Sequence, residues 1–409
     1  MSLLRTDAFT FAPSPARQPA ASSRAARLVL RLLERIGHGE LLLTMPDGQP
    51  MRFGSGLPRA SMRLRNGNVF AASIRSGDIG FAETFIAGDW STDSLADLLS
   101  LFVANRSAIE NAVYGNWFGR LAYRLRHLLN RNTRAGSRRN IHAHYDLGNS
   151  FYRLWLDEGM TYSSALFDGD PQRTLAAAQH AKYARIAGAL GLPAGASVLE
   201  IGCGWGAFAE LAAQRELSVT GLTLSTEQLA WARARIGRAG HDERARFALR
   251  DYRDESGRYD GIVSIEMFEA VGERYWPSYF ETLRRCLKPG GRAVVQTITI
   301  DESLFDRYRR GTDFIQQYVF PGGMLPSASR FAQLAGEAGL RIVDRFAFGR
   351  DYAHTLRHWR ERFAQALPGV RALGFDSSFV RTWEFYLAYC EAAFRHGNTD
   401  VVQFTLEHR

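Results

Sequence analysis

Apolar and polar positions follow different patterns in the first third of this chain and in the remainder. From residue 174 onward, short apolar runs alternate with segments whose apolar residues recur at helical spacing. This alternation is typical of an α/β fold, a mostly parallel sheet with helices on both faces. The predicted helices cover 174–190, begin at 207 and 225, and end at 287, and the predicted strands cover 197–201, 218–224, 245–249, 259–265 and 292–300.

The first third has shorter elements and predicts a smaller mixed α+β domain over residues 27–130. Pro-Asp-Gly and Asn-Gly-Asn turns between apolar runs are typical of connections between strands. The predicted elements are a helix over 24–34, a hairpin of 39–44 and 51–54 joined by Pro46-Asp47-Gly48, strands at 62–65 and 69–74 separated by Asn66-Gly67-Asn68, and a helix near Leu95 capped by Thr92 or Asp93.

The segment 117–139 is strongly basic. Trp117, Phe118 and several leucines recur at helical spacing, while arginines fill the polar positions. Such a helix suits the interfacial layer of an anionic membrane, although packing on its own domain is an equally weighted alternative. Residues 131–140 are rich in Arg, Gly, Ser and Asn and predict an interdomain linker. Residues 1–26 predict a disordered basic tail rather than a secretory signal.

The amino-acid composition limits the kinds of binding partner and the cellular compartment that we expect for this chain. A chain of 409 residues predicts two domains, and a net charge of +9 indicates an acidic partner, either nucleic acid or anionic lipid. No apolar run reaches the roughly 18 residues of a membrane span. Cys203, Cys286 and Cys390 lie far apart, which favours a reducing compartment over a disulfide framework. We therefore expect a cytoplasmic protein.

The run 198–208 reads as a strand, a tight turn and the start of a helix. Alternate glycines in Gly202–Gly206 let the backbone approach a ligand, and Glu200 places a carboxylate at the end of the strand. A dinucleotide-binding turn needs Gly-x-Gly-x-x-Gly and an acidic residue about 20 positions further on. Here the third glycine comes one residue early, and the next strand ends in Thr223 and Leu224. An adenosyl ligand without pyrophosphate fits better, so S-adenosylmethionine is the predicted cofactor.

Six motifs occur in a fixed order along the chain. They are His144–Asn149, Met160–Ala165, Glu200–Gly206, Gly221–Gln228, Glu266–Gly272 and Tyr318–Gly323. Together they resemble the cyclopropane-fatty-acyl-phospholipid synthase family, which includes the mycolic acid cyclopropane synthases and related methyltransferases. The resemblance covers nearly the whole chain, from about residue 35 to the end.

This resemblance implies a Rossmann-like class I methyltransferase fold over residues 141–409, preceded by a domain at 27–130 that interacts with lipid or membrane. It implies transfer of the methyl group of S-adenosylmethionine to the double bond of unsaturated acyl chains in membrane phospholipids, which gives a cyclopropane. A surface turn is the alternative reading of Asp251 and Tyr252. With Glu200, the residues implied to bind the cofactor are Tyr162, Ser163, Gly202, Gly204, Gly206, Thr223, Leu224, Gln228, Asp251 and Tyr252.

The catalytic positions depart from the family pattern. In the family, a bicarbonate held by a cysteine, a glutamate, a histidine and a tyrosine removes the methyl proton. Glu269 and Tyr352 match this set, but Ser164 replaces the cysteine and Gln296 the histidine. Serine and glutamine can each donate a hydrogen bond to an oxyanion, so a modified bicarbonate site stays open. Glu266 is either a base borne by the protein, on the same helical face as Glu269, or a helix cap.

Further candidates come from the resemblance and from the chemistry of a carbocation. Cys390 matches a C-terminal cysteine designated an active-site residue in the family, although its helical spacing among apolar residues favours burial. No metal site is predicted. Aromatic faces attract cations, and the candidates for this role are Tyr145, Phe151, Tyr152, Phe268, Tyr318 and Phe320.

The departures at Ser164 and Gln296 leave the product open between a cyclopropane and a methyl-branched or methylenated chain. Glu266–Glu269 also resembles a segment of plant alkaloid N-methyltransferases, so a small-molecule amine is an alternative acceptor. Nucleic-acid binding is a third reading, but no recognised binding motif is present, and no nucleic-acid partner is expected. We expect peripheral association with an anionic membrane surface at its inner face. A homodimer is one option that the sequence does not decide.

Overall fold

The computed structural model describes residues 23–113 and 147–409, which form two compact units. The first unit contains residues 23–113 together with Arg310–Val319 and Leu367–His396. The second unit contains the other described residues. The family resemblance implied one domain over 141–409, whereas these two later segments pack within the first unit.

Several predictions fall outside the described residues. These are the basic helix in 117–139, the linker at 131–140 and the greater part of the tail at 1–26. At the end of that tail, helix α1 (Arg24–Leu33) begins after Ser23, whose Oγ accepts a hydrogen bond from the backbone N–H of Ala26 at 3.0 Å. Arg24 to Ala26 therefore belong to the first turn of a capped helix.

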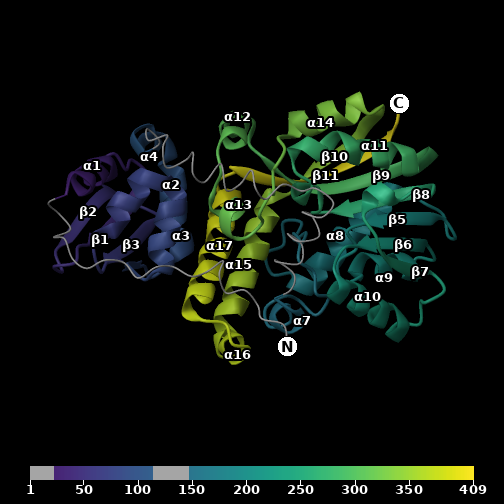
Figure 1. Ribbon diagram of the computed structural model, residues 1–409, viewed down its shortest axis with the longest axis horizontal. Coiled ribbons are helices and arrows are strands. Elements are labelled where there is room, and N and C mark those ends of the chain that lie inside the picture. Colours follow the sequence, from purple (N-terminus) through teal and green to yellow (C-terminus); the bar gives the residue numbers. More distant parts are fainter. Residues whose placement is uncertain (1–22, 114–146) are drawn as a thin grey trace. The chain divides into compact units, whose positions relative to one another are not determined.

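The second unit is built on a seven-stranded sheet with the order β10-β11-β9-β8-β5-β6-β7 (Figure 1). The strands β9, β8, β5, β6 and β7 are parallel, which confirms the predicted α/β fold, and β11 and β10 add an antiparallel edge. The strands are β5 (Ser197–Ile201), β6 (Ser218–Thr223), β7 (Ala245–Leu249), β8 (Tyr259–Ile265), β9 (Leu287–Ile300), β10 (Leu340–Ala347) and β11 (Thr399–His408).

Helices cover both faces of this sheet. The α-helices of the second unit are α7 (Asn149–Tyr152), α8 (Leu175–Leu190), α9 (Ala207–Gln214), α10 (Thr226–Arg238), α11 (Trp276–Cys286), α12 (Glu302–Arg310), α14 (Ala328–Glu337) and α15 (Gly349–Gln365). Short 3-10 helices are η2 (Tyr252–Asp254), η3 (Phe268–Ala270) and η4 (Glu273–Tyr275). In Figure 1, α11 and α14 lie on one side of the strands, and α9 and α10 lie on the other.

Alternation along β5 divides the apolar residues between two cores. Leu199 packs into the core that α11 and α14 cover, whereas Val198 packs into the core beneath α8, α9 and α10. Successive side chains of a strand point to opposite faces, so a strand buried on both faces must be apolar throughout. This explains why the central strands read as continuous apolar runs.

Local signals fix the helix ends next to the sheet. Thr174 Oγ1 accepts a hydrogen bond from the N–H of Ala177 at 3.2 Å and starts α8, and Gly191, with φ 61°, ends it. Ser225 Oγ accepts from the N–H of Gln228 at 3.2 Å and starts α10. Hydroxyl caps and a left-handed glycine are typical of helix starts and ends, which explains why these boundaries could be predicted.

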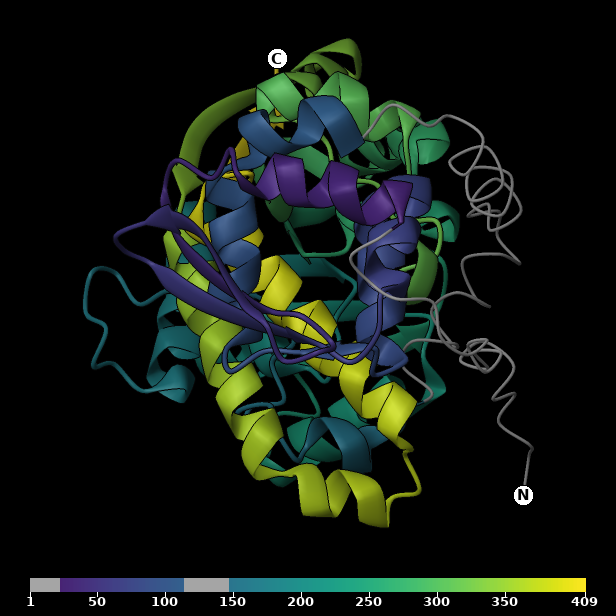
Figure 2. The same cartoon turned by 90° about the vertical axis from the view of Figure 1, so that its left-hand side faces the viewer.

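The first unit contains a four-stranded sheet with the order β2-β1-β3-β4. Figure 2 looks onto these strands, drawn in purple and blue. The predicted hairpin is confirmed, because β1 and β2 pair antiparallel. The elements are β1 (Gly39–Thr44), β2 (Pro50–Ser55), β3 (Arg59–Leu64), β4 (Trp90–Ser91), α1, α2 (Asn68–Ile86), α3 (Leu95–Ala104), α4 (Arg106–Val113), α13 (Phe314–Tyr318), α16 (Leu367–Ala372) and α17 (Ser377–Arg395).

The strand predicted at 69–74 is wrong, because these residues form the start of α2. Val69, Phe70 and Ala72 are buried together, as on one side of a helix, whereas a strand would bury alternate residues. The run is rich in residues that favour strands, but packing within the unit overrides this weak preference. Helix α2 is kinked at Gly77, which has φ 60° and ψ −132°.

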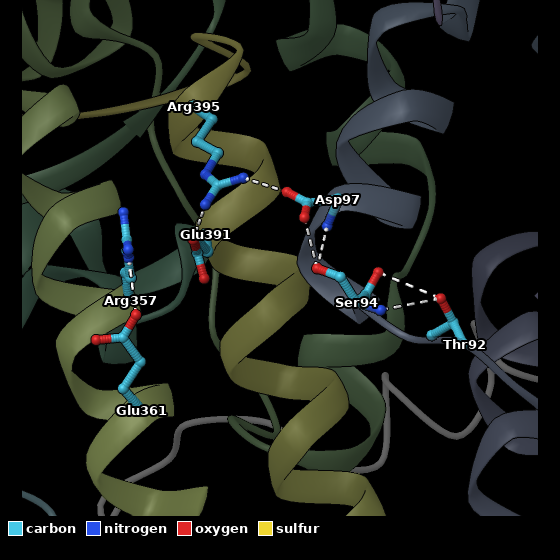
Figure 3. A network of polar contacts seen from close by, with 7 residues as sticks. All are labelled: Thr92, Ser94, Asp97, Arg357, Glu361, Glu391 and Arg395. Atoms are coloured by element: carbon cyan, nitrogen blue, oxygen red, sulfur yellow. Dashed lines mark hydrogen bonds and ion pairs between the residues drawn. The ribbon is translucent and has the colours of Figure 1, made fainter. Parts of the chain in front are cut away.

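The cap predicted for α3 is also wrong. Ser94, rather than Thr92 or Asp93, precedes the helix, and its Oγ accepts from the N–H of Asp97 at 3.4 Å (Figure 3). Asp97 also accepts a hydrogen bond from Arg395 of α17 at 2.9 Å, and Arg395 binds the buried Glu391. This network ties α17 to α3 inside the first unit. None of the helices in the described part of the chain combines the length and apolarity needed to cross a membrane.

The kink in α2 yields a stability prediction. A Cβ added at Gly80 would lie 2.2 Å from the carbonyl oxygen of Ala72, in the preceding half of the helix. Because backbone cannot move aside cheaply, we expect Gly80→Ala to lower the free energy of unfolding by about 2 kcal/mol. Gly188→Ala in α8, where a Cβ meets nothing within 4 Å, should raise it by about 0.5–1 kcal/mol. Denaturant unfolding followed by circular dichroism compares the two variants, and an unchanged Gly80→Ala would contradict the prediction.

Candidate active site

A cavity of about 160 Å³ lies at the carboxyl ends of β5, β6, β7 and β8 in the second unit. This is the edge of a parallel sheet at which α/β proteins bind their ligands. The cavity is lined by every residue that the sequence assigned to the cofactor except Gly206. These are Tyr162, Ser163, Glu200, Gly202, Gly204, Thr223, Leu224, Gln228, Asp251 and Tyr252.

The glycines in the turn after β5 have two different functions. Gly202 has φ 82°, and a Cβ there would lie 2.9 Å from Cγ of Met267, so the turn and the loop after β8 approach closely. Gly206 has φ 83° and precedes α9, and its Cβ would lie 3.1 Å from Cβ of Ala232 in α10. Gly206 therefore allows two helices to pack and does not line the cavity, contrary to its predicted position.

Polar groups on the cavity wall are held in place by their neighbours. Thr223 Oγ1 donates to Oε1 of Gln228 at 3.0 Å and accepts from the N–H of Ser225 at 3.1 Å. Asp251 is buried, starts η2 and accepts hydrogen bonds from the side chain of Arg253 at 2.8 and 2.5 Å. The surface-turn reading of Asp251 is therefore wrong, because the carboxylate is enclosed and paired.

Glu200 brings an unsatisfied acceptor to this wall. The residue is buried, and its Oε2 has no hydrogen-bond partner among the described residues. Burial raises the pKa of Glu200 well above its usual range, while the positive charges of Lys182 and Arg235 act in the opposite direction. A buried carboxylate oxygen without a donor is costly, so a ligand that supplies a hydroxyl or ammonium group would stabilise this site.

The carboxylate of Glu266 is the centre of a second group of residues. Its Oε1 accepts from the backbone N–H of Ser164 at 2.8 Å and from Nε2 of Gln296 at 2.7 Å. Its Oε2 accepts from the hydroxyl of Tyr352 at 2.7 Å. The three donors come from the loop before α8, from β9 and from α15. Three positions that the sequence connected with a bicarbonate therefore converge on a side-chain carboxylate.

This geometry corrects three details of the sequence analysis. Glu266 has φ 49° and directly follows β8, so it neither caps a helix nor shares a helical face with Glu269. The Ser164 hydroxyl donates to the carbonyl of Ala165 at 3.1 Å, and the backbone N–H of Ser164 is the group that binds the carboxylate. A left-handed backbone is costly for glutamate and is typical of functional sites.

Glu269 lies apart from these donors, in η3. Its Oε1 accepts from the Thr297 hydroxyl at 2.9 Å and from the backbone N–H of Ile298, while Oε2 is enclosed and has no hydrogen-bond partner within residues 23–113 and 147–409. Burial, together with the negative charge of Glu266, raises the pKa of Glu269 to about 8. Glu269 is therefore mainly protonated at neutral pH. Tyr352, which the sequence grouped with Glu269, binds Glu266 instead.

Lys182 is a site residue that the sequence analysis missed. It is fully buried in α8, and its Nζ donates to Oγ of Ser163, on the cavity wall, at 2.6 Å. Burial lowers the pKa of Lys182 to about 7, and the carboxylates of Glu266, Asp157 and Glu200 oppose this shift. The signal in the sequence was a lysine four residues after Ala178 and four before Ile186, on the buried stripe of a predicted helix.

Other predicted residues are placed elsewhere. Cys390 belongs to α17 of the first unit, and burial raises the pKa of its thiol, which keeps the sulfur protonated and a poor nucleophile. Tyr318, also in the first unit, donates to Glu83 at 2.5 Å. Phe151, Tyr152 and Phe268 are fully buried core residues and do not line the cavity. Tyr145 lies outside the described residues. Nothing in the structure assigns a role to Phe320.

Comparison with known proteins shows the family of this chain. The family model described as mycolic acid cyclopropane synthetase matches residues 132–404. The chain belongs to this family. The tuberculostearic acid methyltransferase of Mycobacterium tuberculosis is 42% identical to this chain over 400 residues, 95% of this chain and 93% of the relative. The cyclopropane-fatty-acyl-phospholipid synthase of Escherichia coli K12 is 35% identical over 343 residues, 83% of this chain and 86% of the relative.

A solved structure shows the same relationship. The mycolic acid cyclopropane synthase CmaA1 complexed with S-adenosylhomocysteine and CTAB aligns with a TM-score of 0.62 and 33% identity, over 66% of this chain and 97% of that one. As a member of the cyclopropane synthetase family, the protein is an S-adenosylmethionine-dependent methyltransferase. The cavity fits that cofactor, because the orphaned oxygen of Glu200 needs a donor and the glycine turn leaves room for a ligand.

The unsatisfied oxygen of Glu200 leads to a binding prediction. We expect Glu200→Gln to weaken binding of S-adenosylhomocysteine by about tenfold or more, because the amide replaces one of the two carboxyl oxygens and removes an acceptor from the cavity wall. Isothermal titration calorimetry measures the affinity. Glu281→Gln, on the exposed side of α11, is the control and should bind as the wild type does. Equal affinities for all three proteins would contradict the role of Glu200.

The raised pKa of Glu269 leads to a prediction on stability. Its proton is lost near pH 4.5 in the unfolded chain but only near pH 8 in the folded one. The stabilising contribution is thus complete below pH 4.5 and is lost as the pH rises through about 8. Relative to Glu269→Gln, the wild type should lose about 3 kcal/mol of unfolding free energy between pH 5 and pH 8.5. Urea unfolding measures both proteins against pH. If the profiles of the wild type and Glu269→Gln are parallel, Glu269 is ionised throughout this range and the prediction is wrong.

Proposed function

We propose that this protein transfers the methyl group of S-adenosylmethionine to the double bond of an unsaturated acyl chain in a membrane phospholipid, with Glu266 as the base. The observation that carries the proposal is the Glu266 carboxylate, which lines the cofactor cavity and is held by donors from three elements. When bound, S-adenosylmethionine supplies an electrophilic methyl group. An alkene that receives a methyl cation becomes a carbocation, so a neutral product requires the loss of one proton to a base.

The two oxygens of Glu266 differ in their fitness for this step. Oε1 faces two N–H groups, from Ser164 and Gln296, which have no lone pair with which to accept a proton from it. Oε2 faces the hydroxyl of Tyr352, which can rotate from donor to acceptor. We therefore assign Oε2 as the oxygen that takes the proton, with Tyr352 holding the carboxyl group in place before and after the transfer.

The fate of the cation depends on how fast that proton is removed. Loss of a proton from the new methyl group, with closure of a carbon–carbon bond, gives a cyclopropane. If a hydride first moves from the methylated carbon to the adjacent cationic carbon, loss of a methyl proton instead gives a methylene branch. Burial raises the pKa of Glu266, and its three hydrogen bonds act in the opposite direction and hold both carboxyl oxygens in fixed directions. We propose that this fixed carboxylate takes the methyl proton after the hydride shift, so that the methylenated chain is the product.

A cyclopropane, the product expected from the sequence, is the second candidate. It is favoured by the similarity to the cyclopropane-fatty-acyl-phospholipid synthase. A product other than a cyclopropane is favoured by the similarity to the tuberculostearic acid methyltransferase, which extends over more of the chain and at higher identity. Both products carry the same added mass, so a structural assay of the product has to separate them.

A bound bicarbonate does not fit beside Glu266. The Ser164 N–H, the Gln296 amide and the Tyr352 hydroxyl all donate to the Glu266 carboxylate. A second anion there would be repelled by Glu266 and would have to compete for the same donors. We therefore propose no step that uses bicarbonate. Glu266 removes the proton in its place.

The acceptor and the location are part of the same proposal. A net charge of +9 attracts the protein to anionic lipid. A peripheral enzyme bound to the inner face of the cytoplasmic membrane would be in direct contact with unsaturated phospholipids. We propose the phospholipid-bound acyl chain, rather than a free fatty acid, for this reason.

The test uses purified protein, S-adenosylmethionine and anionic vesicles that contain oleoyl phospholipid. We expect a gain of one CH2 unit per modified chain by mass spectrometry, with NMR signals of a terminal methylene group. Glu266→Gln should lower kcat by about 10²–10⁴-fold, because the amide cannot take the proton. Glu281→Gln serves as the control and should retain activity.

Each result bears on a different part of the proposal. Full activity in Glu266→Gln would show that Glu266 is not the base. A strong stimulation of activity by added bicarbonate in carbon dioxide-free buffer would show the same. Cyclopropane signals in the product would replace the methylenated chain by the second candidate. The absence of any mass change in phospholipid would overturn the acceptor class.

A further inference from the structure

A row of polar side chains crosses the sheet from the surface to Glu266. Arg185 of α8 donates from Nη1 to Oε1 of Gln403 at 2.7 Å. Gln403 donates from Nε2 to Oε1 of Gln296 at 3.0 Å, and Gln296 donates from Nε2 to Oε1 of Glu266 at 2.7 Å. Four residues are thus joined by three hydrogen bonds that all point in one direction.

The register of the sheet produces this row. Gln403 on β11 and Gln296 on β9 are direct cross-strand partners, so their side chains lie side by side on one face. Gln296 in turn pairs with Ile265, the last residue of β8, and its carbonyl accepts from the N–H of Glu266 at 2.8 Å. Both glutamines are fully buried. Their amides therefore depend on each other for hydrogen bonds.

The outer end of the row is fixed by strand β10. Arg185 lies over the ring of Phe346 at 3.9 Å and pairs with Asp344 at 2.9 Å. Phe346 is the cross-strand partner of Gln403, so the guanidinium is held directly above the start of the row. The Arg185 side chain is 24% exposed, which places a permanent positive charge at the border between solvent and core.

The chemistry of the two ends determines which way each amide points. A guanidinium has only donors, so Gln403 must present its oxygen to Arg185 and its NH2 group to Gln296. Gln296 must then present its oxygen to Gln403 and its NH2 group to Glu266. An ionised carboxylate, which has only acceptors, matches this orientation. If either amide turned over, two like groups would face each other inside the core.

We propose that Arg185 and Gln403 are positioning residues, which act through Gln296 to keep a hydrogen-bond donor on Glu266 and so hold its carboxylate ionised. The aligned amide dipoles extend the influence of the Arg185 charge along the row. This inference rests on the proposed function of Glu266 as the base, because a base has to be ionised before it can take a proton.

Charged and polar groups outside the row also act on the ionisation of Glu266. Lys182 on α8 stabilises the anion, and the hydroxyl of Tyr352 on α15 donates to it. The negative charge of Glu266 acts on Glu269 in η3, whereas Glu200 and Asp157 act on Lys182. Burial raises the pKa of Glu266, and the donors lower it. Loss of one donor is therefore expected to raise the pKa further.

The decisive variant is Gln403→Glu, with Arg185→Met as a second and milder one. In Q403E the introduced carboxylate still pairs with Arg185, but it offers an acceptor to Gln296. The Gln296 amide then turns over and presents its oxygen to Glu266, which favours the protonated carboxyl. Arg185→Met removes the charge and frees both amides to reorient. Arg185→Lys keeps the charge and should restore most of the wild-type behaviour.

The primary measurement does not depend on turnover. The infrared band of the protonated Glu266 carboxyl group is obtained as the difference between each protein and its Glu266→Gln version, and is followed against pH. We expect the midpoint in Q403E to rise by about one to two pH units, which is the effect of losing a hydrogen bond to a charged group. Arg185→Met should shift it in the same direction by a smaller amount.

The matched control is Thr405→Val on the same strand. Thr405 is buried two residues after Gln403, and its hydroxyl has no described partner, so the exchange keeps shape and breaks no bond. Its midpoint should equal that of the wild type. If the midpoints of Q403E and Arg185→Met, both folded by circular dichroism, also stay at the wild-type value, the proposal is wrong.

Measurements of enzyme activity then distinguish the proposed role of Arg185 and Gln403 from the proposed role of Glu266 as the base. The acid limb of the kcat profile should move upward with the infrared midpoint, while KM for S-adenosylmethionine stays constant. If the infrared midpoint moves but the kcat profile does not, the row is established and Glu266 is not the base. Should Q403E fail to fold, Arg185→Met and Arg185→Lys decide the question, because this side chain reaches solvent.

Discussion

The hydrogen bonds that converge on the Glu266 carboxylate are the interaction on which the site depends. A charge in the interior of a protein is tolerated only where donors replace the water that it has lost. Here the donors come from a loop, a strand and a helix that are far apart in sequence. The ends of β8, β9 and α15 must therefore all be in place before Glu266 can be ionised, which couples the integrity of the sheet to the chemistry of the cavity.

Two carboxyl groups three residues apart lie in different surroundings, although burial raises the pKa of both. Glu266 has three hydrogen-bond donors and the positive charge of Lys182 nearby, whereas one oxygen of Glu269 is enclosed and has no partner in the described part of the chain. Each also influences the other, because the negative charge of Glu266 disfavours a second one on Glu269. A pair of carboxyl groups whose pKa values are pushed apart by environment is a common arrangement for acid and base chemistry. Here Glu266 lines the cavity, whereas Glu269 does not.

Of the two departures from the family pattern, Gln296 acts on Glu266 through its side chain and Ser164 only through its backbone. Ser164 contributes a backbone N–H, Gln296 contributes an amide with a fixed direction, and Glu266 contributes the charge. A neutral histidine also carries one donor and one acceptor on a planar ring, but it loses the acceptor when it is protonated, whereas the Gln296 amide keeps both groups at every pH. The exchange at Gln296 is consistent with replacing a bound anion by the Glu266 side chain.

The sequence by itself determined the parallel sheet and the cofactor turn, because these depend on local patterns, and the family resemblance implied most of the other residues that line the cavity. Periodicity, hydroxyl caps and left-handed glycines act over a few residues and can be read directly. Tertiary structure alone decided that residues 69–74 form a helix, that Tyr352 binds Glu266 rather than Glu269, and that Lys182 and Gln403 belong to the site. Strand register and burial create those relations between distant residues, and neither is encoded in any local segment.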